Sequence, residues 1–395
     1  MHVPDVAIIG AGAAGIACAI SAGRTGRKTI LCDRMAQAGR KILASGNGRC
    51  NIFNEDLSEE CYNSRSRPLV KSVFSRFGRK DIGEFFGSLG LAIYSDCGRI
   101  FPATNQSASV LKVLEIELAR LSIPVVNVFE AASIEKRRGV FTVTSNSGKK
   151  ITASSIVIAT GGRTYPALGS NGSGYTLAER LGHTLVAPVP AAVPLVVKDG
   201  MCHILQGQKI SVKVNALVGR EVVSEAAGDL LFTKYGLSGT SILDISEEVS
   251  IAINRDHRKD VSVIVDMVPF MERDGLQAEL KARIDKKMSP QDIIAGILPN
   301  KFGTALGAVL KSCKAGDIAD HLKNRVFNVL GTRGWNEADF TAGGINTTEI
   351  DNMTLESKVE KGLYFAGEVL DVNGKRGGYN LAWAWASGFV AGAGQ

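Results

Sequence analysis

Val6-Ala7-Ile8-Ile9-Gly10-Ala11-Gly12-Ala13-Ala14-Gly15, near the N-terminus, is the segment from which the fold class follows. Its four leading apolar residues predict a buried strand that runs directly into a glycine turn and then a helix. Gly10 permits the tight turn, Gly12 lets the backbone approach a pyrophosphate, and Gly15 lets the helix pack closely on the strand. The N-terminus of that helix supplies free N–H groups and a positive dipole end, which favour a diphosphate.

A second predicted strand, over residues 28–32, ends at Asp33, which lies 23 positions after Gly10. A carboxylate at this place accepts hydrogen bonds from the ribose of an adenine dinucleotide. A glycine fingerprint between a strand and a helix, followed by a strand that ends in an acid, favours a dinucleotide-binding βαβ unit over an ordinary glycine-rich turn.

The composition is typical of a globular protein with two or three domains, since the chain has 395 residues, of which 45% are hydrophobic and 22% charged. Seven scattered cysteines without a CxxC pair indicate reduced thiols and a cytoplasmic location. The five histidines lack metal-ligand spacing, so we expect no metal site. The first twenty residues read as a strand rather than a signal peptide, and we expect no membrane span.

The net charge of +7 and the pI of about 9.0 raise the question of an anionic partner. The basic residues are spread along the chain, with short clusters only at 24–28, 136–138 and 255–259. We interpret them as solvated surface charge with a few phosphate contacts, so a nucleic-acid partner is not favoured.

The chain divides into segments of different character, which together predict an α/β fold with a discontinuous Rossmann-like nucleotide-binding domain. Residues 1–188 form its first part and residues 338–395 its second part. Between them we expect a β-rich, barrel-like domain over 189–270 and a helical subdomain over 271–337. Helices are expected over 69–90, 107–121, 272–287, 290–298, 301–312, 315–329 and 379–392, and a long ordered loop over 36–54.

Four separated segments resemble the two-dinucleotide-binding-domain flavoproteins, and within them the YhiN/BaiN-like family of FAD-dependent oxidoreductases. They are Gly10–Gly15 with Asp33, Gly39–Asn54, Ile156–Gly162 and Gly362–Leu381. The segment Phe232–Gly239 also resembles this family, and the likeness extends over essentially the whole chain. Asp33 stands where relatives more often have Glu, which gives a shorter reach with the same chemistry.

The resemblance implies an oxidoreductase with non-covalently bound FAD, which carries the hydride chemistry while the protein orients it. NAD(P)H is the expected transient reductant, although the chain has no second Rossmann fingerprint. The substrate is expected to be a small organic molecule, and either an enone-type reductase or an amine or aminoketone oxidase fits. An alternative from another class is an FAD-containing protein that modifies or binds RNA. The sequence leaves the substrate and the oligomeric state open.

The turn geometry and the resemblance together assign the cofactor contacts to residues from both ends of the chain. Ala132 resembles a backbone contact on the adenine side, Thr160-Gly161-Gly162 lets a strand end pass under the nucleotide, and the helix after Gly377-Gly378 faces the flavin pyrimidine edge. The complete set is Gly10, Gly12, Ala13, Ala14, Gly15, Asp33, Arg34, Arg40, Lys41, Ser45, Gly46, Gly48, Arg49, Cys50, Asn51, Ala132, Thr160, Gly161, Gly162, Gly367, Glu368, Asp371, Gly377, Gly378, Tyr379, Asn380 and Leu381.

Several of these residues have a second interpretation. Cys50 has no partner thiol at close spacing, so we interpret it as a packing residue near the flavin rather than a redox thiol. Tyr235 and Tyr379 are candidate acids, and each is equally well a positioning residue. Trp383 and Trp385 are expected in the core. Lys375 and Arg376 precede the flavin-facing turn, where they would favour an anionic or carbonyl-bearing substrate.

Overall fold

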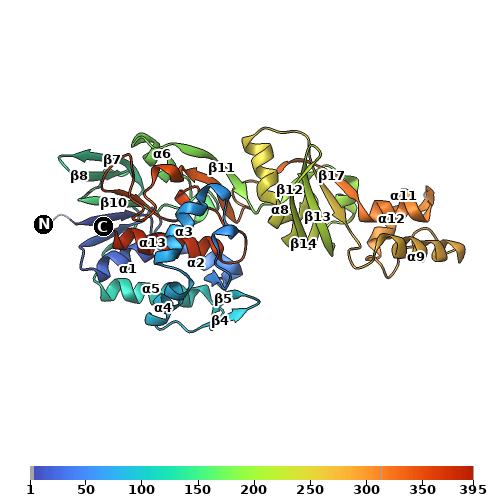
Figure 1. Ribbon diagram of the computed structural model, residues 1–395, viewed down its shortest axis with the longest axis horizontal. Helices are drawn as coiled ribbons and strands as arrows, with labels where there is room; N and C mark the ends of the chain where they lie inside the picture. The colour runs from blue at the N-terminus through green and yellow to red at the C-terminus, as the bar shows by residue number, and fades with distance from the viewer. Residues whose placement is uncertain (1–3, 313, 395) are drawn as a thin grey trace. The chain divides into compact units, whose positions relative to one another are not determined.

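The computed structural model describes residues 4–312 and 314–394, so Cys313 lies outside the described residues. The chain separates into two compact units (Figure 1). Unit 1 comprises Met1–Pro188 and Phe340–Gln395, and unit 2 comprises Val189–Asp339.

A five-stranded parallel sheet forms the centre of unit 1. Its strand order is β19-β10-β1-β2-β6, with β19 at Leu363–Phe365, β10 at Ser155–Ile158, β1 at Val6–Ile9, β2 at Thr29–Cys32 and β6 at Val125–Val126. Ile9 pairs with Cys32 on one side and with Ile158 on the other. All four residues of β1 are buried, as expected for an apolar strand inside a parallel sheet. The predicted Rossmann-like fold is therefore confirmed.

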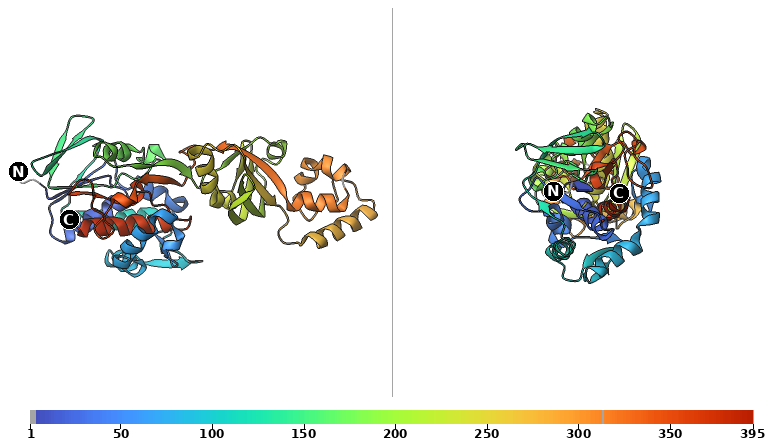
Figure 2. Two further views of the ribbon diagram at one scale, coloured as in Figure 1. Left: turned by 45° about the horizontal axis from the view of Figure 1, so that its top comes forward. Right: turned by 90° about the vertical axis from the view of Figure 1, so that its left-hand side faces the viewer.

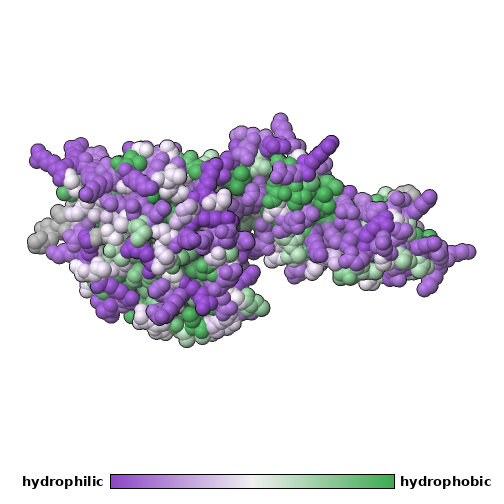
Figure 3. Space-filling view, in the orientation of Figure 1, coloured by the Kyte–Doolittle hydropathy of each residue, from purple (hydrophilic) through white to green (hydrophobic). Residues whose placement is uncertain are grey.

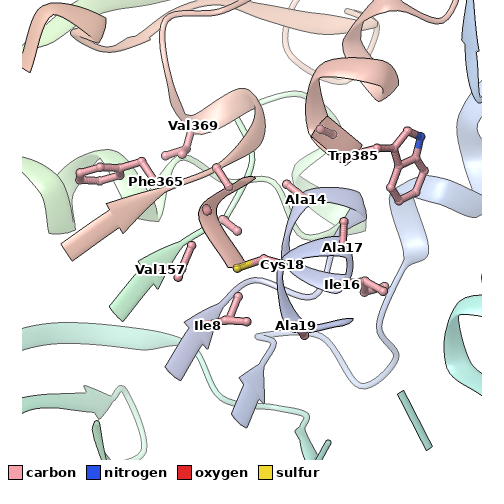
Figure 4. Packing of buried hydrophobic residues seen from close by; sticks show 14 of the residues in the cluster. Ile8, Ala14, Ile16, Ala17, Cys18, Ala19, Val157, Phe365, Val369 and Trp385 are labelled. Carbon is pink, nitrogen blue, oxygen red and sulfur yellow. The ribbon is translucent and has the colours of Figure 1, made fainter. Parts of the chain in front are cut away.

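Helices α1 (Ala13–Arg24) and α13 (Tyr379–Ala393) come from opposite ends of the chain and pack against each other (Figures 2 and 4). The contact is close because glycines face it. A Cβ on Gly388 would overlap the carbonyl oxygen of Ala14, and a Cβ on Gly392 would overlap that of Cys18. Trp383 and Trp385 are both buried, as predicted, and their indole N–H groups donate to the carbonyl oxygens of Gly367 and Ile52, at 3.1 Å each.

Shorter elements surround this core. The helices are α2 (Arg40–Ala44), α3 (Arg67–Arg76), α4 (Arg79–Ser88), α5 (Ser107–Arg120) and α6 (Ser173–Arg180). Two further sheets have the orders β3-β5-β4 and β7-β8-β9, and β11 pairs with β18. The strands are β3 (Phe53–Asn54), β4 (Ile93–Asp96), β5 (Arg99–Pro102), β7 (Ala131–Arg137), β8 (Val140–Ser145), β9 (Lys150–Ala153), β11 (Leu185–Ala191) and β18 (Phe340–Ile345).

One helix was expected over 69–90, but the structure has two, α3 and α4. The chain breaks at Phe77 and Gly78, and the side chain of Asp81 accepts the backbone N–H of Gly78 at 2.8 Å. This cap starts a new helix, which the apolar periodicity alone did not reveal.

Unit 2 contains a closed antiparallel barrel of order β12-β15-β14-β13-β16-β17, so the expected barrel-like insert is confirmed. The strands are β12 (Leu195–Val197), β13 (Lys209–Val218), β14 (Glu221–Thr233), β15 (Gly236–Ser238), β16 (Val261–Asp266) and β17 (Arg325–Thr332), with helices α7 (Gly200–Ile204) and α8 (Thr240–Ser250) beside them. Alternate residues point inward, as in β13, where Ile210, Val212 and Val214 are buried. Figure 3 shows hydrophobic surface on the barrel, and Val326 and Leu330 of β17 are exposed.

Between β16 and β17 the chain forms the helices α9 (Arg273–Asp285), α10 (Lys301–Ala305), α11 (Gly307–Ser312) and α12 (Ala315–Lys323). The helix expected over 290–298 is a series of turns, and the one expected over 315–329 ends at Lys323. From Arg325 onward, buried and exposed residues alternate, so this segment forms a strand of the barrel.

The charge of the chain is divided unevenly between the two units. Unit 2 carries 19 Lys and Arg residues and 19 Asp and Glu residues, so the whole net charge of +7 belongs to unit 1. In the described ranges, no helix has the length and apolarity required to cross a membrane.

Candidate functional site

The glycine turn between β1 and α1 has no room for a side chain at two of its three glycines, but it has free space at the third. A Cβ on Gly10, whose φ is +106°, would overlap the carbonyl oxygen of Ala159. A Cβ on Gly15 would overlap the carbonyl oxygen of Gly10. At Gly12, by contrast, an added Cβ would meet no atom of the described residues within 4 Å. The steric reasons given for Gly10 and Gly15 are therefore confirmed, and Gly12 borders free space at the N-terminus of α1.

Asp33 lies where β2 ends, and its carboxylate faces the glycine turn. It accepts the backbone N–H of Ala11 at 2.6 Å and that of Met35 at 2.7 Å. Burial raises the pKa of Asp33, while these two hydrogen bonds oppose the shift. A carboxylate offers about four lone-pair sites, so Asp33 can still accept from hydroxyl groups of a ligand. Its neighbour Arg34 pairs with Glu130, at 3.1 Å between Nε and Oε1.

The segment 39–51 folds against the glycine turn. The N–H of Gly39 donates to the carbonyl oxygen of Ala11 at 2.8 Å. Lys41 then reaches the C-terminal part of unit 1, where its Nζ lies 2.8 Å from Oε2 of Glu368 and 2.9 Å from Oγ1 of Thr164. The other carboxylate oxygen of Glu368 accepts the N–H of Thr341 at 2.8 Å. This ion pair joins two segments that lie 327 positions apart.

The two arginines of the segment 39–51 have different surroundings. Arg40 is half-buried, and within the part of the chain that the structure describes no acidic side chain pairs with it. Arg49 is directed to the β4–β5 hairpin, where it donates to Tyr94 at 2.9 Å and stacks over Phe101 at 4.1 Å. Arg40 is thus available to an anion, whereas Arg49 is already engaged by Tyr94, Asn105 and Asp96.

Cys50 is fully buried next to a left-handed turn that includes Ser45, Gly46 and Gly48. Its N–H donates to the carbonyl oxygen of Ser45 at 3.0 Å. Burial raises the pKa of the Cys50 thiol to about 11, which leaves little thiolate at neutral pH. This agrees with a packing residue better than with a redox thiol.

Five buried polar side-chain atoms lack a hydrogen-bond partner among the described residues, and two of them are oxygens of the predicted site. These two oxygens are Oγ1 of Thr160, after β10, and Oδ1 of Asn51. Asn51 Oδ1 lies beside the start of α13, since a Cβ on Gly378 would come within 2.8 Å of it. Buried polar groups are normally paired, so these two atoms mark places where a ligand would satisfy them. Directly after Thr160, a Cβ on Gly161 would lie 2.9 Å from Oγ of Ser170, and a Cβ on Gly162 would overlap Thr341.

The segment that leads into α13 is held from several sides. The amide of Asn380 accepts from the N–H of Gly374 at 2.9 Å and donates to its carbonyl oxygen at 2.8 Å. Asn63 donates to the carbonyl oxygen of buried Asp371 at 3.1 Å and accepts the N–H of Asn373 at 3.1 Å. Sequence reasoning missed Asn63, because its only signal is a contact with residues about 310 positions away.

The remaining predicted residues have other settings. Ala13 and Ala14 begin α1, Gly367 packs against Ala14, and Leu381 lies against the core of unit 1. The carbonyl oxygen of Ala132 accepts from Arg180 at 2.9 Å.

The two tyrosine candidates belong to different units. Tyr379 is buried at the first turn of α13, and burial, together with a hydrogen bond to the Cys61 side chain, raises its pKa well above the ordinary value. Its phenol therefore keeps its proton at neutral pH. Tyr235 lies in unit 2, on the turn between β14 and β15, and Arg333 lies over its ring at 4.6 Å.

The donor set fits an adenine dinucleotide with an extended tail, such as FAD. The open face at Gly12 suits a pyrophosphate, Asp33 suits a ribose, and the atoms without partners at Thr160 and Asn51 suit polar groups farther along the ligand. No group of three or more His, Cys, Asp and Glu residues that could hold a metal occurs in residues 4–312 and 314–394.

Known proteins resemble this chain along its whole length. A family model described as "HI0933-like protein Rossmann domain" matches residues 4–394. The 3-dehydro-bile acid delta(4,6)-reductase of Clostridium scindens is 36% identical, with 98% of each chain covered. The ribosomal RNA dihydrouridine synthase of Escherichia coli is 32% identical, with 98% of this chain and 96% of that protein covered. Among solved structures, a flavocytochrome c3 fumarate reductase in an open conformation has a TM-score of 0.50 at 16% identity, covering 100% of this chain and 78% of that one.

Proposed function

This chain belongs to the HI0933-like Rossmann family of FAD-dependent oxidoreductases, and from that membership we propose that it reduces a carbon–carbon double bond conjugated with a carbonyl group. The family membership makes it a flavoprotein oxidoreductase. The proposal concerns the class of substrate, the residues that hold the cofactor and the source of electrons.

The relatives support this choice of reaction. One is named for reducing a 3-dehydro bile acid, and the other for making dihydrouridine in ribosomal RNA. Dihydrouridine differs from uridine by two hydrogens added across one double bond beside a carbonyl group. The two names therefore describe the same chemical change on very different molecules. An amine or aminoketone oxidase, which the sequence also allowed, has no counterpart in these names.

The observation that carries the cofactor proposal is the free space at Gly12, because the same turn is closed at Gly10 and Gly15. We propose that the pyrophosphate of FAD lies there, that Arg40 neutralises part of its charge, and that Asp33 accepts the adenosine ribose hydroxyls. The first turn of α13 and the Asn51 side chain would contact the pyrimidine end of the flavin. The other predicted contacts stay part of the same proposal.

FAD, once reduced by NAD(P)H, would supply the hydride that is added to the β-carbon of the conjugated system. The protein must then deliver one proton to the α-carbon, so that the product gains two hydrogens in total. We propose Tyr379 for this step, because it begins α13, whose first turn is the predicted contact with the flavin. NADH or NADPH is the proposed reductant. Residues 1–188 and 338–395 would form the FAD-binding domain, with 189–270 and 271–337 as the inserted parts.

The test uses the purified holoprotein under anaerobic conditions. The flavin is released by denaturation and identified, and the intact protein is then reduced with NADH or NADPH. Reoxidation is measured separately with a conjugated enone, a quinone and oxygen. We expect released FAD and fast reoxidation by the enone with formation of the saturated ketone. A protein without FAD that takes up none, or a reduced protein that reacts with oxygen but no enone, would contradict the proposal.

A second candidate substrate is uridine in RNA, and the charge distribution favours it. The net charge of +7 lies entirely in unit 1, whose fold carries the predicted flavin site. Binding of RNA that weakens steeply with salt, together with new dihydrouridine in that RNA, would support this candidate. RNA binding without modification would exclude it.

A further inference from the structure

We propose that Arg99 and Lys375 form a binding site for an anionic group of the substrate, a carboxylate or a phosphate. The two cations lie at the loop of residues 373–378, directly before α13. This inference rests on the proposed function, because it adds a property of the substrate to the same site.

The backbone that presents Lys375 is firmly held. The N–H of Lys375 donates to the carbonyl oxygen of Cys61 at 3.0 Å. The preceding residue, Gly374, is bound on both its N–H and its carbonyl group by the side chain of Asn380. The exposed ammonium group therefore extends from a fixed backbone. Binding of a ligand then costs less conformational entropy than it would if Lys375 lay on a mobile loop.

Arg99 reaches the same loop from a different part of the chain. It begins β5 and pairs in register with Asn54 of β3. The amide of Asn54 donates to the carbonyl oxygen of Gly377 at 2.9 Å. A Cβ on Gly377 would lie 3.7 Å from Nε of Arg99, so the guanidinium group lies against the loop two residues after Lys375.

Neither cation is neutralised within the described residues. Arg99 and Lys375 are exposed, and no acidic side chain of residues 4–312 and 314–394 forms an ion pair with either one. The charges of Asp56 and Arg99 both affect the pKa of Tyr379: Asp56 raises it and Arg99 lowers it. The first turn of α13 holds no acidic residue. Asp96, which pairs with Arg99 across the β4–β5 hairpin, is engaged by Arg49.

The ammonium group of Lys375 lies on the fixed loop, and the guanidinium group of Arg99 reaches that loop from β5. Together they suit a single anionic group, because charge-assisted hydrogen bonds are stronger than neutral ones. The carboxylate of a steroid side chain and the phosphate of a nucleotide share this chemistry. In both cases the anion would hold the substrate by a part that does not react, so its removal should weaken binding without changing the flavin.

The experiment measures binding to the oxidised holoprotein by equilibrium dialysis at low ionic strength. Two pairs of probes are used: a 3-oxo-4-ene steroid carboxylic acid with its methyl ester, and uridine 5′-monophosphate with uridine. The variant is Arg99→Ala with Lys375→Ala. Its matched control is Lys149→Ala with Lys150→Ala, which removes the same charge at the start of β9. Arg376 is left unchanged because it has an interaction of its own.

We expect the anion of one pair to bind about tenfold more tightly than its neutral partner, and the pair that shows this identifies the source of the anion. The Arg99/Lys375 variant should lose the difference while it retains FAD, and the Lys149/Lys150 control should keep it. The charge-conserving variant Arg99→Lys with Lys375→Arg should restore most of it. Equal binding of both members in the unmodified protein, or an undiminished difference in the variant, would overturn the proposal.

The outcome also separates this inference from the proposed function. Selective binding of an anion by a holoprotein that reduces none of the four probes with NADH or NADPH would overturn the proposed reaction and leave the anion site in place. Reduction of a probe by a holoprotein that binds the anion and its neutral partner equally would support the proposed reaction and overturn the anion site. Binding of no probe at all would count against both.

Discussion

Replacing Gly12 by valine should abolish FAD binding while leaving the fold intact, whereas replacing Gly15 by alanine should damage the fold. The two glycines lie three positions apart in one turn, but their surroundings differ. A side chain at Gly12 would enter open space with an ordinary φ of −84°, and one at Gly15 would collide with the carbonyl group of Gly10. The same type of change is therefore expected to have opposite effects.

The magnitudes follow from these contacts. Valine is a poorer helix N-cap than glycine, so Gly12→Val should cost the apo-protein about 1 kcal/mol or less. Overpacking at Gly15 should cost about 1–3 kcal/mol or more, since a backbone atom has to move. For a domain of this size that lowers the Tm by roughly 3–10 °C. FAD at a hundred times its Kd stabilises the unmodified protein by about 2.7 kcal/mol, or roughly 5–10 °C.

Thermal unfolding with and without FAD separates the two effects, and fluorescence quenching gives the FAD affinity directly. Gly12→Val should melt close to the unmodified apo-protein and gain nothing from FAD, with an affinity lowered at least about 100-fold. Gly15→Ala should melt earlier in both conditions. A Gly12→Val protein that binds FAD within about threefold of normal would refute the placement of the pyrophosphate, and an unchanged Tm in Gly15→Ala would refute the packing argument.

Four further outcomes are expected. Asp33→Ala should weaken FAD binding about 10- to 150-fold, from the loss of charge-assisted hydrogen bonds worth about 1.5–3 kcal/mol, and titration with FAD measures this; unchanged affinity would remove Asp33 from the site. Cys50→Ser should keep turnover within about tenfold, because the buried thiol has a high pKa, and steady-state kinetics with FAD still bound checks it. Tyr379→Phe should lower turnover by about 100-fold or more while reduction of the flavin by NAD(P)H is unaffected, which stopped-flow absorbance resolves. Burial lowers the pKa of His183, whose Nδ1 lies 2.9 Å from Oε2 of Glu349. As the pH falls below about 6.5, the unfolded chain therefore binds a proton at this histidine more readily than the folded protein does. The free energy of unfolding in urea should decrease between pH 7.5 and pH 5, and it should decrease less in His183→Gln.

The parts of the fold that depend on local patterns were predictable from the sequence. The glycine turn and its strands follow from steric rules that act within about thirty residues, and the structure has them in the expected places. The β-rich character of residues 189–270 was also predicted, but the barrel strand β17 at Arg325–Thr332 was expected to be largely helical. The helix expected over 290–298 was wrong because short apolar runs fit turns and helices alike.

The contacts between distant segments were not predictable. Lys41 was expected at the cofactor, but no local signal indicated that Glu368 would be its partner. Asn63 was missed for the same reason, since its hydrogen bonds to Asp371 and Asn373 exist only after the sheet has brought both segments together. The cofactor contacts themselves stay predictions, because they concern atoms that belong to the ligand.

The packing of α13 on α1 has a consequence for synthesis of the protein on the ribosome. Helix α1 and strand β1 emerge long before α13, which packs on α1, and before β19, which pairs with β10 of the same sheet. At a synthesis rate of about 5–20 residues per second, the apolar surface of α1 stays uncovered for roughly 20–70 s before α13 is made. Unit 2 is one continuous segment and can complete its barrel during that delay. The N-terminal half of unit 1 is thus the part of the nascent chain that most needs a chaperone, and loss of the last fifteen residues should yield aggregated protein rather than a smaller folded one.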